Sequence, residues 1–140
     1  DLMLLKKYWF TDRVYHHTAP GPMVFALKEA LTLIQEEELS NRVARHQKVG
    51  DLLKAGLTDL GLELFGDPSN RLSMLTCVMI PDGAEDAEVR GRLLNEFGIE
   101  IVGGFGPLMG KAWRIGLMGY SATERNVHYL LAALKEILAG

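Results

Sequence analysis

Apolar residues recur every three or four positions in four segments of this chain, which is the spacing of amphipathic helices. The first predicted helix begins at Pro22, because proline suits the first helical position, and the second ends before Gly61. The third covers residues 86–97 with Gly98 as its cap, and the fourth follows a capping box at Ser121–Glu124. The predicted inward-facing positions are, in chain order, Met23, Leu27, Ala30, Leu31 and Ile34; Leu39, Val43, His46, Gly50, Leu53, Leu57 and Leu60; Val89, Leu93 and Phe97; and Val127, Leu130, Leu131, Leu134 and Leu138.

Shorter apolar runs after the second helix are typical of strands. Met74–Ile80 is a continuous apolar run that predicts a buried strand, and residues 62–65 predict a short strand before it. Residues 99–102 and 112–117 predict two further strands, separated by a glycine-rich turn. The order helix, helix, strand, strand, helix, strand, strand, helix predicts an α+β fold: a small, mainly antiparallel sheet with helices on one face.

Residues 1–20 follow neither pattern. They are rich in aromatic residues and end in the turn chemistry of Pro20, Gly21 and Pro22, so an irregular, extended segment is predicted there. Residues 21–60 form a predicted helical connection, and residues 61–140 form the predicted α+β domain. Because the chain starts at Asp1 without an initiator methionine, we expect it to be cut from something longer or to be processed.

The composition is typical of a soluble globular protein of one ordinary domain. Of the 140 residues, 48% are hydrophobic and 24% are charged, which is enough to bury a core. The net charge of −3, without a stripe of Lys and Arg, gives no support for binding to nucleic acid or a membrane surface. Cys77 is the only cysteine, so an internal disulfide and a thiolate metal site are excluded, and a buried core thiol is expected.

Arg114 is the most informative charged residue, because it lies between apolar neighbours just after a glycine-rich stretch. A guanidinium keeps its charge in a protein, so burial among such neighbours requires an anion. Its planar fork suits a carboxylate or phosphate bound by two parallel hydrogen bonds. One interpretation is a carboxylate-binding site at the end of a strand. An equally supported alternative is an ion pair with Glu100 on the neighbouring strand.

Two other motifs are compatible with ligand binding, although pattern alone favours a structural role for both. The Gly103–Pro107 turn would let backbone N–H groups approach a ligand, or would only connect two strands. In Tyr15–Thr18 the two hydroxyls would donate to phosphate oxygens, or the histidines would bond to carbonyls of a turn. Adjacent histidines are expected to diverge and no third ligand follows at a useful spacing, so no metal site is predicted.

No catalytic group stands out from the residues alone. His46 and His128 lie on predicted helices and are expected to be structural. No nucleophile lies beside a base, so the residues favour a binding role over a catalytic one.

Taken together, three motifs resemble the C-terminal portion of class V aminotransferases of the alanine–glyoxylate and serine–pyruvate type. They are Tyr15–Thr18, the turn from Gly103-Gly104 to Gly110-Lys111, and Trp113–Gly116. The resemblance runs from about Tyr15 to the end of the chain. It includes, in the expected order, Arg42 and His46, Glu100-Ile101, Ala122-Thr123 and Asn126-Val127.

The resemblance implies part of a pyridoxal 5'-phosphate enzyme of fold type I. Such an enzyme moves an amino group from a small amino acid, alanine or serine, to a 2-oxo acid, glyoxylate or pyruvate. It implies that Arg114 binds the substrate α-carboxylate and that Gly104 lies in the turn beside it. It also implies that Tyr15 and Thr18 reach across a homodimer interface to the cofactor phosphate of the other subunit. A cytoplasmic homodimer is expected, with residues 1–20 as a dimer arm.

The chain departs from this family in one respect. None of its lysines lies in the context of the family's cofactor-binding lysine, which precedes the tyrosine by more residues than are present here. We therefore expect the small domain and dimer arm alone, with no catalytic residue and no activity of its own. The lysines that lie outside the family's lysine context are Lys6, Lys7, Lys28, Lys48, Lys54, Lys111 and Lys135.

The alternative is a free-standing, non-enzymatic α+β domain that binds a small amino acid through Arg114.

Overall fold

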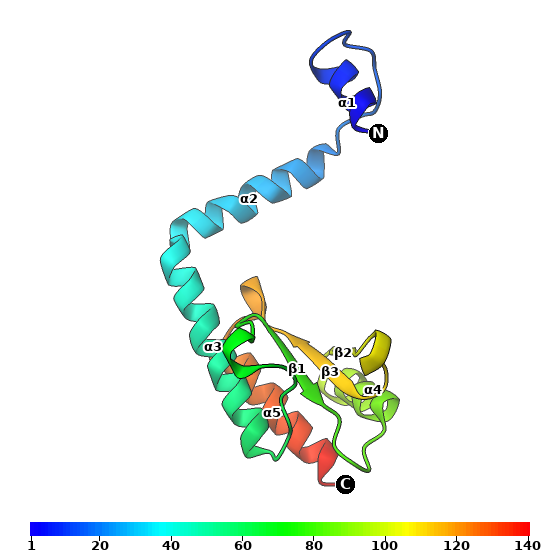
Figure 1. The fold of residues 1–140 in the computed structure, drawn as a ribbon. Coiled ribbons are helices and arrows are strands. Elements are labelled where there is room, and N and C mark those ends of the chain that lie inside the picture. The colour runs from blue at the N-terminus through cyan, green and yellow to red at the C-terminus, as the bar shows by residue number, and fades with distance from the viewer. The chain divides into compact units, whose positions relative to one another are not determined.

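The computed structural model describes all 140 residues, which divide into two compact units (Figure 1). The first unit is Asp1–Glu38 and the second is Leu39–Gly140. Their boundary lies inside the predicted connection 21–60, between two helices. The division into 1–20, 21–60 and 61–140 stays a prediction.

The first unit contains two helices, α1 (Leu2–Trp9) and α2 (Gly21–Glu37). The prediction of an irregular segment is wrong for α1: the Asp1 side chain accepts a hydrogen bond from the Met3 N–H, and the Leu, Met and Lys residues that follow are strong helix formers. Residues 13–20 are non-helical, as expected. Neither helix buries a side chain within this unit, and no helix of the chain combines the length and hydropathy needed to cross a membrane.

The second unit is a three-stranded sheet with three helices, which confirms the predicted α+β fold. The strand order is β1-β3-β2 and both pairings are antiparallel. Its elements are α3 (Leu39–Asp59), β1 (Leu75–Met79), α4 (Asp86–Phe97), β2 (Val102–Gly103), β3 (Ala112–Gly116) and α5 (Glu124–Leu138). Short 3-10 turns cover Pro68–Asn70, Gly106–Leu108 and Gly119–Ser121.

Two of the predicted strands are shorter than expected. Residues 62–65 contribute only an isolated bridge between Leu64 and Val78, because the chain turns away at Gly66, which has a φ of +86°. The strand predicted for residues 99–102 is reduced to β2. Its first N–H, that of Ile99, donates instead to the Leu93 carbonyl at the end of α4.

The start of α5 also differs from the sequence prediction. The capping residue is Thr123, whose hydroxyl accepts from the Asn126 N–H, and not Ser121. Ser121 lies in the preceding 3-10 turn, where its hydroxyl bonds to the backbone of Met118. The capping residue of the helix is therefore Thr123, two positions after the Ser121 that the sequence pattern indicated.

Along β1 and β3, successive side chains alternate between a face of the sheet that packs on the helices and an open face. On the packed face, Trp113 and Val78 are fully buried against helix residues such as Leu53 and Leu134. Cys77 lies on the open face and is half-buried, so the expected core thiol is wrong. Partial burial raises the pKa of the Cys77 thiol, although the nearby charge of Arg114 opposes this.

Candidate functional site

Arg114 lies on the central strand β3, with its side chain on the open face of the sheet. Its Cα partners are Cys77 on β1 and Val102 on β2. The residue is half-buried, and Val102 beside it is 52% exposed. Strand alternation explains this placement, because Trp113 and Ile115 on either side point into the core.

The guanidinium of Arg114 is held by two groups of the glycine-rich turn. Its Nε donates to the Gly103 carbonyl at 3.0 Å, and its Cζ lies 4.9 Å from the centroid of the Phe105 ring. The alternative ion pair with Glu100 is not formed, since Val102 rather than Glu100 lies opposite Arg114. Both terminal nitrogens are thus left without an acceptor, in the arrangement that a bidentate carboxylate requires.

The turn between β2 and β3 requires glycine at Gly104 for a structural reason. Its N–H donates to the Ala112 carbonyl at 2.7 Å, and a Cβ at this position would overlap the Leu108 carbonyl oxygen. Gly106 and Gly110 in the same turn have positive φ values of +56° and +68°. The turn therefore fixes the Gly103 carbonyl that orients Arg114, and a direct role of Gly104 in substrate binding stays a prediction.

Asp86 contacts β3 on the packed face of the sheet, through Trp113. The sequence analysis did not predict a role for it. Its carboxylate accepts from Trp113 Nε1 at 3.0 Å and from Arg90 Nε and Nη2 at 2.8 and 3.0 Å. The hydrogen bond from Arg90 is the main cause that lowers the pKa of Asp86. The spacing of Asp86 and Arg90 could have indicated their ion pair. Nothing in the sequence indicated the contact with Trp113.

His46 has the structural role expected for it. It is buried on α3, its Nδ1 lies 2.7 Å from the Arg42 carbonyl oxygen, and its Nε2 accepts from the Gly119 N–H at 3.0 Å. Arg45 Nη1 donates to the carbonyls of Gly119 and Ala122. Together these bonds attach α3 to the turn that precedes α5.

Tyr15 and Thr18 lie in the first unit, after α1. Their hydroxyl oxygens are 2.8 Å apart, and the Tyr15 side chain is 69% exposed with its ring edge against Tyr8. The two histidines between them converge instead of diverging: their Nδ1 atoms are 3.0 Å apart, so the expected bonds to turn carbonyls are wrong. No group of three or more His, Cys, Asp or Glu side chains could hold a metal ion.

The two pairs of predicted site residues belong to different units of the structure. Arg114 and Gly104 are in Leu39–Gly140, whereas Tyr15 and Thr18 are in Asp1–Glu38. Within its own unit, each pair is brought together.

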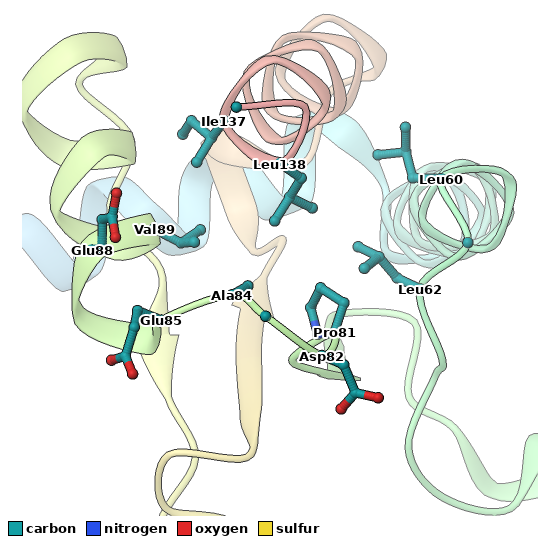
Figure 2. Close-up of a pocket in the computed structure, with 13 residues that line it drawn as sticks. Leu60, Leu62, Pro81, Asp82, Ala84, Glu85, Glu88, Val89, Ile137 and Leu138 are labelled. Carbon is teal, nitrogen blue, oxygen red and sulfur yellow. The ribbon is translucent and has the colours of Figure 1, made fainter.

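A pocket of about 430 Å³ lies elsewhere in the second unit, between the ends of α3 and α5 and the loop before α4 (Figure 2). The side chains of Leu62, Val89 and Leu138 point toward its centre, and the carboxylates of Asp82 and Glu85 point away from it. None of the predicted site residues lines this pocket. Its lining contains no Lys, Arg or His side chain that would pair with a substrate carboxylate.

Comparison with known proteins identifies the class. No family model matches the chain. Over nearly its whole length, however, the chain is homologous to part of the class V pyridoxal-phosphate aminotransferases, which confirms the predicted resemblance. Solved aminotransferase structures share its fold, which confirms the predicted fold class.

The particular relatives are transaminases that use glyoxylate, according to their names. (S)-ureidoglycine–glyoxylate transaminase of Bacillus subtilis is 47% identical over 138 residues, which cover 99% of this chain and 33% of that protein. Alanine–glyoxylate aminotransferase of Felis catus is 42% identical over 142 residues, which cover 99% of this chain and 34% of that protein. The crystal structure of alanine–glyoxylate aminotransferase from Nostoc sp. matches with a TM-score of 0.91 at 49% identity, covering 99% of this chain and 37% of that one. The chain thus spans about a third of the length of these relatives, which is consistent with a C-terminal portion.

Proposed function

We propose that this chain is the part of a pyridoxal-phosphate-dependent aminotransferase that holds the α-carboxylate of the substrate. The observation that carries the proposal is the state of Arg114: its Nε and its face are engaged by Gly103 and Phe105, and both terminal nitrogens are free. The homology to aminotransferases over 99% of the chain supports it. The substrates would be a small amino acid, alanine or serine, and a 2-oxo acid, glyoxylate or pyruvate.

Arg114 contributes orientation as well as affinity. A carboxylate bound by two parallel N–H donors cannot rotate about the guanidinium, so the bonds at the substrate Cα are presented in one direction. Phe105 and the Gly103 carbonyl restrict the guanidinium itself before the substrate arrives. Less side-chain freedom then remains to be lost on binding.

Tyr15 and Thr18 are suited to hold the cofactor phosphate. Their hydroxyls lie side by side at 2.8 Å on an exposed segment, so both protons can turn toward one acceptor group, and this donor set fits a phosphate. When bound, pyridoxal 5'-phosphate supplies the electron sink for the transfer of the amino group. We propose that the two hydroxyls bind the cofactor phosphate of the other subunit in a cytoplasmic homodimer, as the family resemblance implies.

The chain supplies binding groups and no catalytic residue in this proposal. The cofactor-binding lysine would lie in the part of the relatives that this chain does not span. The alternative of a free-standing domain that binds an amino acid receives no support from the comparisons, because the relatives named above are aminotransferases.

Replacing Arg114 with methionine in the protein encoded by the complete gene tests the proposal. Each charge-assisted hydrogen bond is worth about 1.5–3 kcal/mol, so the loss of two should lower kcat/KM for the amino acid roughly 100-fold or more. The cofactor should still bind, as seen in its absorbance. Arg125→Met, at an exposed arginine of α5, is the matched control and should behave like the wild type. A wild-type KM in Arg114→Met would remove Arg114 from the site.

The same variant separates the alternative function. Calorimetry of the chain alone with alanine should show no saturable binding, because the proposed site also needs groups from the part of the relatives that this chain does not span. Saturable alanine binding that is lost in Arg114→Met would favour the free-standing domain.

A further inference from the structure

A cavity of about 290 Å³ lies at the outer edge of β1, away from every site residue predicted above. It is lined by α3, by the loop that follows residue 65, and by β1 itself. Strand β1 separates it from the Arg114 strand, since Cys77 lines the cavity and is the Cα partner of Arg114. Three side chains on its walls, Lys54, Arg71 and Thr76, each have a donor group without a hydrogen-bond acceptor.

The first donor is Thr76. It points to the helix-covered side of β1 and is only 4% exposed, yet its Oγ1 has no hydrogen-bond partner. A buried hydroxyl without a partner destabilises the folded protein, and valine would fill the same space without that cost. The hydroxyl therefore indicates a partner that the chain does not supply.

The second donor is Lys54 on α3. Its side chain is 14% exposed, and its ammonium lies 3.6 Å from Asp51 Oδ1, which is too long for a hydrogen bond. Both oxygens of Asp51 already accept from Gln47 Nε2 at 2.9 Å. A mostly buried ammonium normally has closer partners, so acceptors are missing here as well.

The third donor is Arg71. Its Nε and Nη2 donate to the carbonyls of Phe65, Leu64 and Gly66, and these bonds fix the guanidinium while Nη1 has no acceptor. The one carboxylate on the wall, Asp67, accepts hydrogen bonds from Ser69 and Asn70, and its charge also interacts with Arg71 without a hydrogen bond to Nη1. Donors from three separate elements thus outnumber the available acceptors.

We propose that this cavity binds a small oxyanion, a carboxylate or a phosphate, at a second site that is independent of Arg114. An oxyanion offers several acceptor lone pairs in one compact group, which is what Lys54, Arg71 and Thr76 lack. A bound water would satisfy the Thr76 hydroxyl but would leave the Lys54 ammonium with the 3.6 Å contact to Asp51 as its one anionic partner and with no hydrogen-bond acceptor. The inference rests on the cavity alone and does not depend on the proposed function.

Isothermal titration of the protein with inorganic phosphate and with acetate, at constant ionic strength in chloride, tests the inference. Saturable binding of one equivalent of either anion is expected. Binding of phosphate would indicate a phosphate ligand, and binding of acetate would indicate a carboxylate ligand. Lys54→Met should weaken it about tenfold or more, and Thr76→Val should weaken it several-fold without loss of the fold. Lys135→Met, at an exposed lysine of α5, is the matched control and should bind as the wild type does.

The Arg114→Met variant should also retain this binding, which separates the second site from the substrate site. The absence of saturable heat for both anions would overturn the inference. So would undiminished binding in Lys54→Met, or crystal structures in phosphate and in acetate that both show only water in the cavity.

Discussion

Replacing Asp86 with alanine should destabilise the fold more than any other single change at an acidic residue of α4. One carboxylate holds together the first turn of this helix and the central strand, through Trp113 Nε1 at 3.0 Å and two N–H groups of Arg90. Trp113 directly precedes Arg114 in β3. The variant therefore removes the support under the strand that carries the proposed substrate arginine.

The magnitude follows from the burial of the partners. The Trp113 side chain is fully buried, so its indole N–H would be left without an acceptor, at a cost of about 1–3 kcal/mol. The Arg90 and Asp86 side chains are 35% and 22% exposed, and a helical pair of this kind adds about 0.3–0.5 kcal/mol. The free energy of unfolding should fall by roughly 1.3–3.5 kcal/mol in total.

Urea denaturation of the protein at pH 7, followed by circular dichroism, measures this change. Asp82→Ala is the control, since Asp82 is an exposed aspartate in the loop just before α4. Asp86→Asn should retain stability in part, because its amide oxygen can still accept from Trp113. If Asp86→Ala cost less than about 0.5 kcal/mol, or no more than Asp82→Ala, the carboxylate would not hold these elements together.

The pH dependence gives a second check on the same residue. In the folded protein the pKa of Asp86 is lowered, chiefly by the hydrogen bond from Arg90. A carboxylate with a lowered folded pKa contributes its full stabilisation above its unfolded pKa of about 3.9. That contribution is lost as the pH falls through the folded value. The difference in unfolding free energy between wild type and Asp86→Ala should therefore narrow below about pH 4, and a constant difference down to pH 2 would contradict the assignment.

Three further changes test the site and its supports. Phe105→Leu removes the ring from the face of the Arg114 guanidinium, a contact worth about 0.5–1 kcal/mol, so KM for the amino acid in the complete enzyme should rise roughly two- to fivefold. Phe105→Tyr should restore it, and an unchanged KM in the leucine variant would exclude the contact. Gly104→Ala places a Cβ on a backbone carbonyl oxygen and should lower the unfolding free energy by about 1–3 kcal/mol in urea denaturation, whereas Gly91→Ala, where a Cβ meets nothing, should not. His46→Leu removes the acceptor of a backbone N–H and should cost about 1–3 kcal/mol in the same assay; a change below 0.5 kcal/mol would make that bond dispensable.

The helices were the most predictable part of the fold, because a periodic apolar stripe and a cap define a helix locally. Residues 86–97 with Gly98 in the left-handed conformation match the prediction at both ends. Strand lengths were less predictable, because they depend on where backbone groups find partners elsewhere. The Ile99 N–H bonds to the end of α4, which keeps residues 99–101 out of the sheet.

The site shows the same limit. From the sequence, a carboxylate-binding Arg114 and an ion pair with Glu100 were equally supported. The register of β2 against β3 places Val102, not Glu100, opposite Arg114, and carboxylate binding by Arg114 stays a proposal. The position of Cys77 likewise depends on which side of β1 faces the helices, which a continuous apolar run does not reveal. The contact between Asp86 and Trp113 joins residues 27 apart in the chain, and no local pattern carries it.

The residues from Gly103 to Arg114 act together to orient the Arg114 guanidinium. Close approach of the backbone at Gly104 sets the turn, and the turn places both the Gly103 carbonyl on Nε and the Phe105 ring on the face of Arg114. On the opposite side of β3, the bond from Trp113 to Asp86 fixes the strand itself. An arginine held in this way has its two terminal nitrogens available, which is the arrangement that the proposed binding of one planar anion in one orientation requires. This explains why glycines, an aromatic ring and a buried tryptophan accompany the arginine: the turn and Phe105 restrict the guanidinium, and Trp113 fixes the strand that carries it.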